Sequence, residues 1–466
     1  MMEMLTCNLD RGSNIPLYEQ LYDYIKNEIM EGRIPYGTKL PSKRKLSEFL
    51  TISQNTVEQA YDQLGAEGYI EGFPRKGYFV LAHEDLEYVQ PVRYENMPEQ
   101  ETEPIKYNFH PSRIDTENFP FEKWRKSAKN IIDKENQALL LMGDWQGERV
   151  LREEIAHYIY QARGVHCSPE AIILGAGVET LLQQLILLLG NQAAYGVEDP
   201  GYHAISRILK NYPNEVSPLE VDGKGVKVDN LEGSKLDIVY VTPSRHFPYG
   251  AVLSANRRIK LLNWAASKEK RFIIEDDYDS EFRYVGKAIP SLQSMDQNDK
   301  VIYLGTFSKS LIPSIRISYM VLPKQLIKLY KEKLSFFQCS VSRIDQHILA
   351  RFMREGDFEK HLNRMRKVYR RKMDKTLELL KPYERFVEVV GDLSGFHIVL
   401  KVNNGMPEKE LVERALQKSV KVYPLSSYLL ESHYESQPII ILGFAGIPES
   451  ELANAIELLL KSWKIL

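Results

Sequence analysis

At 466 residues the chain is too long for one hydrophobic core of ordinary size, so its length predicts two or three domains. Hydrophobic residues make up 43% and charged residues 27%, as in globular proteins, and neither a membrane span nor a signal peptide is indicated. The net charge of −2 excludes nucleic-acid binding by bulk charge and leaves local basic clusters as the possible contacts.

Three zones follow one another along the chain. Residues 14–80 are compact and rich in helical patterns, residues 81–104 gather acidic residues and prolines, and residues 105–466 alternate short apolar strands with helices. We expect a first domain, an acidic linker and a larger second domain with these bounds. The three cysteines are isolated and lack zinc-ligand spacing, so we expect no disulfide, no metal site and a reducing cytoplasm.

The first zone predicts three helices followed by a hairpin. Apolar residues recur at helical spacing in three stretches, at residues 16–31, 43–50 and 54–67. Ser42 is placed to cap the second helix. Aromatic and apolar residues then flank a basic segment at 75–77, which predicts a two-stranded wing with a basic tip.

The second and third helices, joined by a short turn, have the arrangement of a helix-turn-helix, whose second helix enters the major groove. The third helix is expected to expose polar residues that can pair with adenine or contact a thymine methyl. The start of the second helix and the wing tip suit phosphates. A structural three-helix domain is the alternative. The residues expected to contact DNA are Ser42, Lys43, Arg44, Gln54, Asn55, Thr56, Lys76 and Gly77.

Five segments of this zone carry a family resemblance: LPSKRKL (40–46), SQNTV (53–57), AYDQL (60–64), EGYI (67–70) and GYFV (77–80). Together they resemble the GntR family of winged-helix repressors. The resemblance implies a winged helix-turn-helix that binds a double-stranded DNA operator. The chain departs from it at Gln54, where many relatives carry arginine, so we expect a different operator with one charge-assisted guanine contact fewer.

The third zone predicts an α/β domain. Apolar strands are expected over residues 171–174, 193–197, 238–241, 271–275, 301–305 and 317–322. Amphipathic helices lie between them, for example over 180–189 and 257–269, so the pattern predicts βαβ units and a mainly parallel sheet buried on both faces. A smaller α+β subdomain is expected over about 358–466, with a basic helix at 358–380 and strands at 386–390, 395–402 and 439–444.

The segment VIYLGTFSK (301–309) ends a predicted strand with small hydroxyl residues and a lysine. A lysine forms a Schiff base with an aldehyde when its surroundings deprotonate part of the amine. Thr306 and Ser308 can donate to a phosphate, and the guanidinium of Arg316 can clamp one. A loop lysine is by itself usually a solvated charge, so the role of Lys309 depends on neighbouring segments.

Three further segments point to the same chemistry. A predicted strand delivers Asp276, Asp277 and Tyr278 at its carboxyl end, where α/β sheets bind ligands. The glycine-containing turn at 175–180 leads from a strand into a helix, so its backbone N–H groups and the helix dipole suit a phosphate. Tyr202 follows Pro-Gly and can stack on a flat ring.

In chain order these segments are a phosphate turn, a stacking aromatic, an acidic strand end, a lysine and an arginine, and they resemble fold-type I enzymes of the aminotransferase family. The stretches GERVLREEIA (147–156) and TPSRHFPYG (242–250) fit as well. The resemblance implies pyridoxal 5′-phosphate (PLP) as cofactor, bound to Lys309 as a Schiff base, with Asp276 rather than Asp277 facing the ring nitrogen. Tyr278 would face the phenolic oxygen. The implied ring and phosphate contacts are Tyr202, Gly177, Val178, Thr306, Ser308 and Arg316.

The two modules in this order look like the MocR subfamily of GntR regulators. This resemblance implies a PLP-dependent transcription regulator, in which the aminotransferase-like domain is a sensor rather than a working enzyme. It also implies a head-to-tail, domain-swapped homodimer. The alternative is an active PLP-dependent aminotransferase with an accessory N-terminal domain.

The resemblance is incomplete where aminotransferases bind the carboxylate of an amino acid. No arginine follows Arg414, and Ile441 stands about where the family's carboxylate-binding arginine is expected. Ala204 and Ser427 occupy positions at which GABA-responsive relatives carry arginines. A buried carboxylate without a partner is costly, so a GABA-like effector is not expected.

Two interpretations of the effector remain open. In one, an amino compound reacts with the cofactor at Lys309 and shifts the conformation of the body; in the other, PLP itself is the ligand that is sensed. Arg245 or Arg207 can in principle replace the missing carboxylate partner. Either interpretation requires the ligand to contact two states of the protein differently.

Overall fold

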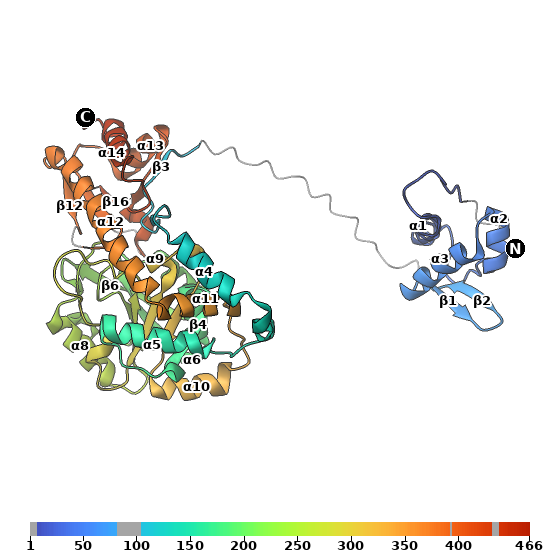
Figure 1. Ribbon diagram of the computed structural model, residues 1–466, viewed down its shortest axis with the longest axis horizontal. Helices are drawn as coiled ribbons and strands as arrows, with labels where there is room; N and C mark the ends of the chain where they lie inside the picture. Colours follow the sequence, from blue (N-terminus) through green and yellow to red (C-terminus); the bar gives the residue numbers. More distant parts are fainter. Residues whose placement is uncertain (1–6, 82–103, 392–393, 431–437) are drawn as a thin grey trace. The chain divides into compact units, whose positions relative to one another are not determined.

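The computed structural model describes residues 7–81, 104–391, 394–430 and 438–466, and contacts divide the chain into two units, 1–101 and 102–466. Each unit is described by itself below (Figure 1). The linker expected over 81–104 lies outside the described residues, apart from its two end residues. Within the described ranges, no helix is long and apolar enough to cross a bilayer.

The first unit consists of three helices and a hairpin. Its elements are α1 (Leu17–Met30), α2 (Lys43–Leu50), α3 (Gln54–Ala66), β1 (Ile70–Phe73) and β2 (Gly77–Val80). The helix bounds agree with the sequence prediction to within one residue at each end. The two strands pair antiparallel, from Ile70 opposite Val80 to Phe73 opposite Gly77, and form the expected wing.

Local capping fixes the turn between α2 and α3. The Oγ of Ser42 accepts a hydrogen bond from the backbone N of Lys45, and the Oγ of Ser53 accepts one from the backbone N of Thr56. Thr51 between the helices adopts the left-handed conformation at φ 53°. The apolar stripe of α3, formed by Val57, Ala60, Tyr61 and Leu64, is buried with the apolar face of α1, which leaves the polar start of α3 outside the core.

The second unit is built on an eight-stranded sheet with the order β4-β11-β10-β9-β8-β5-β6-β7. The strands are β4 (Ile172–Gly175), β5 (Ala194–Asp199), β6 (Glu215–Asp222), β7 (Gly225–Val226), β8 (Ile238–Val241), β9 (Phe272–Asp277), β10 (Val301–Thr306) and β11 (Ser318–Val321). Pairing is parallel from β6 through β5, β8 and β9 to β10, whereas β11 runs antiparallel to both β10 and β4. The sheet is therefore mainly parallel, as expected, but the sequence prediction missed β6 and β7.

Helices cover both faces of this sheet. Side chains of α6 (Val178–Leu189), α7 (His203–Lys210) and α10 (Lys324–Leu334) pack on one face. Those of α5 (Arg149–Arg163), α8 (Ala255–Ala266) and α11 (Arg343–Arg354) pack on the other. Neighbouring residues of a strand alternate between the faces, so Ile273 joins one core and Ile274 the other. This two-sided burial explains why the strands read as continuous apolar runs.

The smaller subdomain begins at α12 (Asp357–Leu380) and has a four-stranded antiparallel sheet with the order β12-β13-β16-β15. Its strands are β12 (Val387–Val390), β13 (His397–Val402), β15 (Tyr423–Pro424) and β16 (Ile439–Gly443). It also contains the helices α13 (Glu408–Gln417) and α14 (Leu452–Ser462). A separate short pair joins β3 (Tyr107–Asn108) to β14 (Val420–Lys421), so the start of the second unit is bound to its C-terminal part.

Candidate functional site

A cavity of about 200 Å³, open to solvent, lies where β9 and β10 end and α6 begins. Every residue that the sequence proposed for the cofactor lines it: Gly177, Val178, Tyr202, Asp276, Tyr278, Thr306, Ser308, Lys309 and Arg316. The carboxyl ends of parallel strands are the usual place for ligands in such sheets. The lining residues that sequence reasoning did not single out are Pro111, Ser112, Glu179, Thr242, Phe247, Pro313 and Ser318.

Lys309 lies on the short helix α9 (Phe307–Ser310), directly after β10. Its Nζ donates a hydrogen bond of 2.8 Å to the backbone oxygen of Ser112. Burial lowers the pKa of the Lys309 amine to about 8, against the opposing influence of Asp279. A sizeable fraction of the amine is therefore neutral near pH 8, which is the form that attacks a carbonyl carbon.

The two neighbouring aspartates of β9 face opposite sides. Asp276 lines the cavity and accepts a hydrogen bond of 2.6 Å from the hydroxyl of Tyr240, while burial raises its pKa to about 7. Asp277 points away, where its Oδ2 accepts from the Nε of Arg163 at 2.6 Å and from the hydroxyl of Tyr303 at 2.5 Å. The alternation of side chains along a strand thus gives one aspartate to the cavity and the other to a buried ion pair.

Tyr278 is held in the wall by Arg245. The hydroxyl of Tyr278 accepts a hydrogen bond of 2.9 Å from Nη1 of Arg245, which also forms a buried ion pair of 2.9 Å with Asp279. The other nitrogens of this guanidinium donate to the backbone oxygens of Ser394 and His397. Because these contacts occupy the guanidinium, Arg245 serves to position Tyr278 and does not replace the missing carboxylate partner.

One end of the cavity forms a cradle for an anion. The helix α6 begins here after Gly177, whose φ of 102° favours glycine, and a Cβ at this position would overlap the guanidinium of Arg316. Within the described residues, the buried Oγ of Ser308 has no hydrogen-bond partner. Arg316 forms an ion pair of 2.8 Å with Glu179, in the first turn of α6. Backbone N–H groups at the start of α6, a hydroxyl and a guanidinium therefore line the same cavity.

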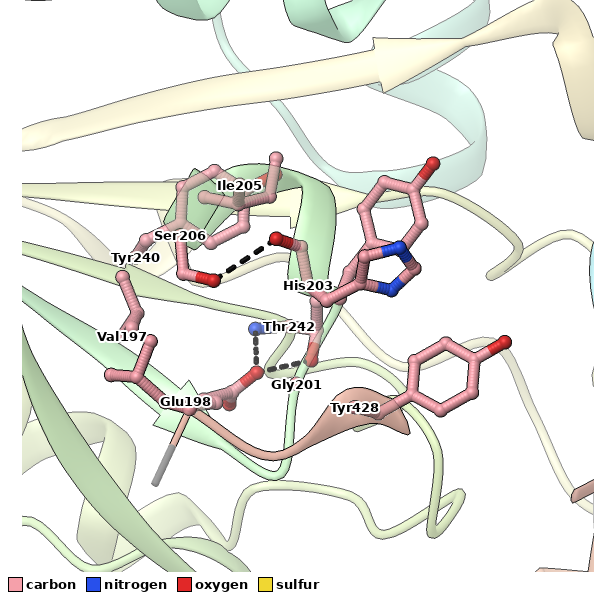
Figure 2. A pocket seen from close by; sticks show the side chains of 11 residues that line it. Val197, Glu198, Gly201, His203, Ile205, Ser206, Tyr240, Thr242 and Tyr428 are labelled. Carbon is pink, nitrogen blue, oxygen red and sulfur yellow. Dashed lines mark hydrogen bonds between the residues drawn. The ribbon is translucent and has the colours of Figure 1, made fainter. Parts of the chain in front are cut away.

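A smaller cavity lies behind this site and shares Tyr202 and Thr242 with it. Figure 2 shows Glu198 below Thr242, accepting from its backbone N at 3.0 Å and from its Oγ1 at 2.5 Å. Burial raises the pKa of Glu198 to about 8, so this carboxyl group carries a proton over much of the neutral range. These bonds fix the loop after β8, in which Thr242 forms part of the wall of the larger cavity.

The wall towards the small subdomain is apolar. Ile441 is fully buried in β16 and belongs to a cluster with Phe247 and Tyr428. Arg207 is exposed and is absent from the cavity lining within the described residues. In that part of the chain, Arg316 is the one arginine that lines the cavity. Within the described residues, the cavity lining therefore contains two cationic side chains, Arg316 of the anion cradle and Lys309. Because Lys309 is the amine that would react, Arg316 alone is left to pair with a ligand carboxylate.

The expected DNA-binding residues lie on α2, α3 and the wing. Gln54, Asn55 and Arg44 are exposed, with 80% of the Arg44 side chain accessible. Lys43 is instead engaged within the unit, by ion pairs of 2.7 Å with Glu58 and 3.5 Å with Asp62. Ser42 caps α2, Thr56 donates its backbone N–H to the capping Oγ of Ser53, and Lys76 and Gly77 form the wing turn.

Some of the missed residues had a recognisable signal and others had none. Glu179 lies within the glycine-containing segment 175–180 that leads into a helix, so its place near the start of that helix was visible in the sequence. Thr242 opens the segment TPSRHFPYG, which resembles a family motif. Ser112 lies 197 residues before Lys309 and contributes a backbone oxygen, which any residue type supplies. Its position depends on tertiary structure alone.

Comparisons with known proteins divide the chain in the same way. Residues 17–80 match the bacterial regulatory proteins of the gntR family, and residues 108–459 match aminotransferase class I and II. The uncharacterized HTH-type transcriptional regulator YdeL of Bacillus subtilis is 45% identical over 99% of this chain and 100% of its own length. The probable rhizopine catabolism regulatory protein MocR of Rhizobium meliloti is 30% identical over 96% of this chain and 94% of its own.

A third relative is the HTH-type pyridoxine biosynthesis transcriptional regulator PdxR of Corynebacterium glutamicum, at 31% identity over 96% of both chains. Among solved structures, the kynurenine aminotransferase of Pyrococcus horikoshii, in complex with PMP, covers 78% of this chain and 91% of its own at 27% identity and a TM-score of 0.68. The multiple substrate aminotransferase of Thermococcus profundus covers 81% and 97%, at 26% identity and a TM-score of 0.69.

Proposed function

The chain belongs to the MocR subfamily of GntR regulators, and from this membership we propose that it is a PLP-dependent transcription regulator. The observation that carries the proposal is the buried amine of Lys309, inside a cavity lined by Asp276 and Tyr278, in a chain that also carries an exposed recognition helix. The first unit binds operator DNA, and the second binds the cofactor and responds to its ligand.

The residues of the cavity fit PLP. Among the side chains that line the cavity, two buried polar atoms have no hydrogen-bond partner within the described residues: the Oδ1 of Asp276 and the Oγ of Ser308. The first suits a protonated ring nitrogen, and the second, in the same cavity as Arg316, suits a phosphate. PLP supplies an aldehyde that combines with amines and a ring that withdraws electrons. Lys309 is then the residue that holds it covalently.

Two effector classes remain candidates: an amino compound that reacts at the cofactor, and PLP itself. The lining favours a ligand without a free carboxylate, because Arg316 serves the phosphate and Arg245 is occupied by Asp279 and Tyr278. An amine lacking an acidic group satisfies this condition, and so does the cofactor alone. An unpartnered carboxylate in such a cavity would cost several kcal/mol, roughly the penalty of burying an unpaired ion.

We further propose that the regulator acts as a homodimer with exchanged DNA-binding units. Several large apolar side chains of the second unit are strongly exposed, as on a surface that a second copy covers. They include Phe121, Ile132, Leu140, Leu141, Met142 and Phe336. Measuring the mass of the full-length protein in solution tests this, and a monomer at micromolar concentration would contradict it.

The function is tested with the full-length protein and a random pool of DNA duplexes. We expect a defined sequence to be selected, and its affinity to change when PLP, or PLP with a series of amines, is added. A control incubation with an amino acid and a keto acid measures turnover. Sustained transamination without selection of any duplex would instead favour the active aminotransferase.

A further inference from the structure

The anion cradle contains a negatively charged residue of the chain itself. Glu179 stands in the first turn of α6, and its Oε2 lies 2.8 Å from Nη2 of Arg316. A Cβ built on Gly177 would lie 2.6 Å from the same carboxylate oxygen, so the carboxylate stands directly over the backbone of the glycine turn. Both charged residues line the cofactor cavity.

This position is the one that suits a bound phosphate. A helix N-terminus attracts negative charge, and here the same end of α6 is accompanied by Arg316 and the unpartnered hydroxyl of Ser308. The carboxylate of Glu179 satisfies part of this attraction from within the chain. A phosphate group carries a charge of about −1.5 to −2 near neutral pH, so it repels a carboxylate held at the same point.

We propose that Glu179 is an internal competitor of the cofactor phosphate. It holds Arg316 while the cradle contains no phosphate, and it must release the guanidinium before a phosphate can enter. Occupancy by PLP then follows the PLP concentration over a range set by this competition. The inference rests on the proposed function and deepens it, because it assigns PLP itself as a ligand that the protein senses.

The exposure of the pair permits the exchange. The side chains of Arg316 and Glu179 are 49% and 38% exposed, so Glu179 has solvent to move into and the ion pair is weak. The side chains of Arg245 and Asp279 are only 2% and 1% exposed. If this ion pair separated, each charge would be left buried without a partner. Glu179 is therefore an exchangeable partner, whereas Asp279 is a fixed one.

The test compares full-length wild type with Glu179→Gln, which keeps the size of the side chain and removes its charge. Glu215→Gln is the matched control, because Glu215 is an exposed residue at the start of β6 and outside the cavity lining. Affinity is measured for PLP, for pyridoxal, which lacks the phosphate, and for inorganic phosphate by the shift in melting temperature. A Glu179→Ala variant repeats the measurement without a side-chain amide.

We expect Glu179→Gln to bind PLP about tenfold more tightly than wild type, from loss of a like charge near the phosphate. Inorganic phosphate should stabilise this variant more than wild type, whereas the affinity for pyridoxal stays unchanged. Equal PLP affinity in both proteins, or weaker binding by the variant, overturns the proposal. If wild type binds no PLP, the proposed function fails, and inorganic phosphate still decides the role of Glu179.

Discussion

The Nζ of Lys309 lies 2.8 Å from the backbone oxygen of Ser112, which stands four residues after β3 at the beginning of the second unit. This segment follows the part of the chain that leads from the DNA-binding unit. A buried ion pair of 2.7 Å between Asp115 and Lys372 holds it nearby. When the amine of Lys309 bonds elsewhere, the backbone oxygen of Ser112 loses its donor, so a change at the proposed cofactor site reaches this segment directly.

Hydrogen exchange should report this contact. We expect addition of PLP to change the exchange rates of backbone amides around Ser112 in wild type, because the bond from Lys309 is withdrawn. In Lys309→Ala, which lacks the donor, PLP should leave those rates almost unchanged. Mass spectrometry of peptides covering residues 107–118 measures both. A change of equal size in Lys309→Ala would show that the exchange rates of this segment do not depend on the hydrogen bond from Lys309.

Lys309→Ala should abolish covalent attachment of PLP. After reduction with borohydride, wild type should gain the mass of one cofactor per chain, whereas the variant should gain none and still melt cooperatively. The rate of attachment in wild type should rise with pH and level off above about 8, since burial lowers the pKa of the amine to about 8. Attachment in Lys309→Ala would show that another amine reacts.

Lys309→Met should stabilise the cofactor-free protein at neutral pH. The pKa of the Lys309 amine is about 8 in the folded protein and 10.5 in the unfolded chain. Below pH 8 the buried charged amine therefore lowers the stability of the folded state. Unfolded chains bind more protons between these values, so wild-type stability rises with pH across that interval. We expect a gain on the order of 3 kcal/mol at pH 7, which disappears above pH 10.5.

Chemical denaturation at several pH values measures this difference. A gain in Lys309→Met that stays constant from pH 7 to pH 11 would assign it to packing rather than to the charge.

Replacing the two neighbouring aspartates of β9 should have opposite consequences. Asp277→Asn removes a partner of Arg163 in a pair that is 5% and 2% exposed, so we expect a loss of about 3–5 kcal/mol of stability. Asp276→Asn should leave the melting temperature nearly unchanged and weaken PLP binding roughly 10- to 100-fold, through loss of a charge-assisted hydrogen bond. Thermal melts and PLP titrations distinguish the two variants. Equal effects of both variants in both assays would contradict the assignment of Asp277 to stability and of Asp276 to PLP binding.

Arg44→Ala should weaken DNA binding on every duplex and reduce the slope of affinity against salt by about one. Its exposed ion pair with Glu48 contributes little to stability, so the fold should be unaffected. Lys43→Ala provides the contrast, because that amine bonds to Glu58 and Asp62 and its loss should lower the melting temperature of the first unit. Unchanged DNA affinity in Arg44→Ala would show that Arg44 does not contact the phosphates and that other residues do.

Periodicity and capping predicted the first unit almost completely, since Ser42 and the stripe of α3 are local features. The parallel strands were found because two-sided burial makes them continuously apolar. The extension of the sheet by β6 and β7 was missed, because β6 is partly exposed and contains Pro218. The lysine and the acidic strand end were recognisable in the sequence, and the family resemblance named Asp276 rather than Asp277. The alternation of side chains along β9 gives the physical reason for that choice. The ion pairs of Arg245 and Glu179 depend on tertiary geometry and carry no local signal.

The pairing of β3 with β14 limits where the chain can be divided. A fragment of the second unit that starts downstream of Ser112 lacks the strand β3 that pairs with β14. It also lacks the backbone oxygen that accepts the hydrogen bond from Nζ of Lys309. A cut just before Tyr107 keeps both. A second unit made as a separate fragment therefore has to retain the short stretch that directly follows the linker.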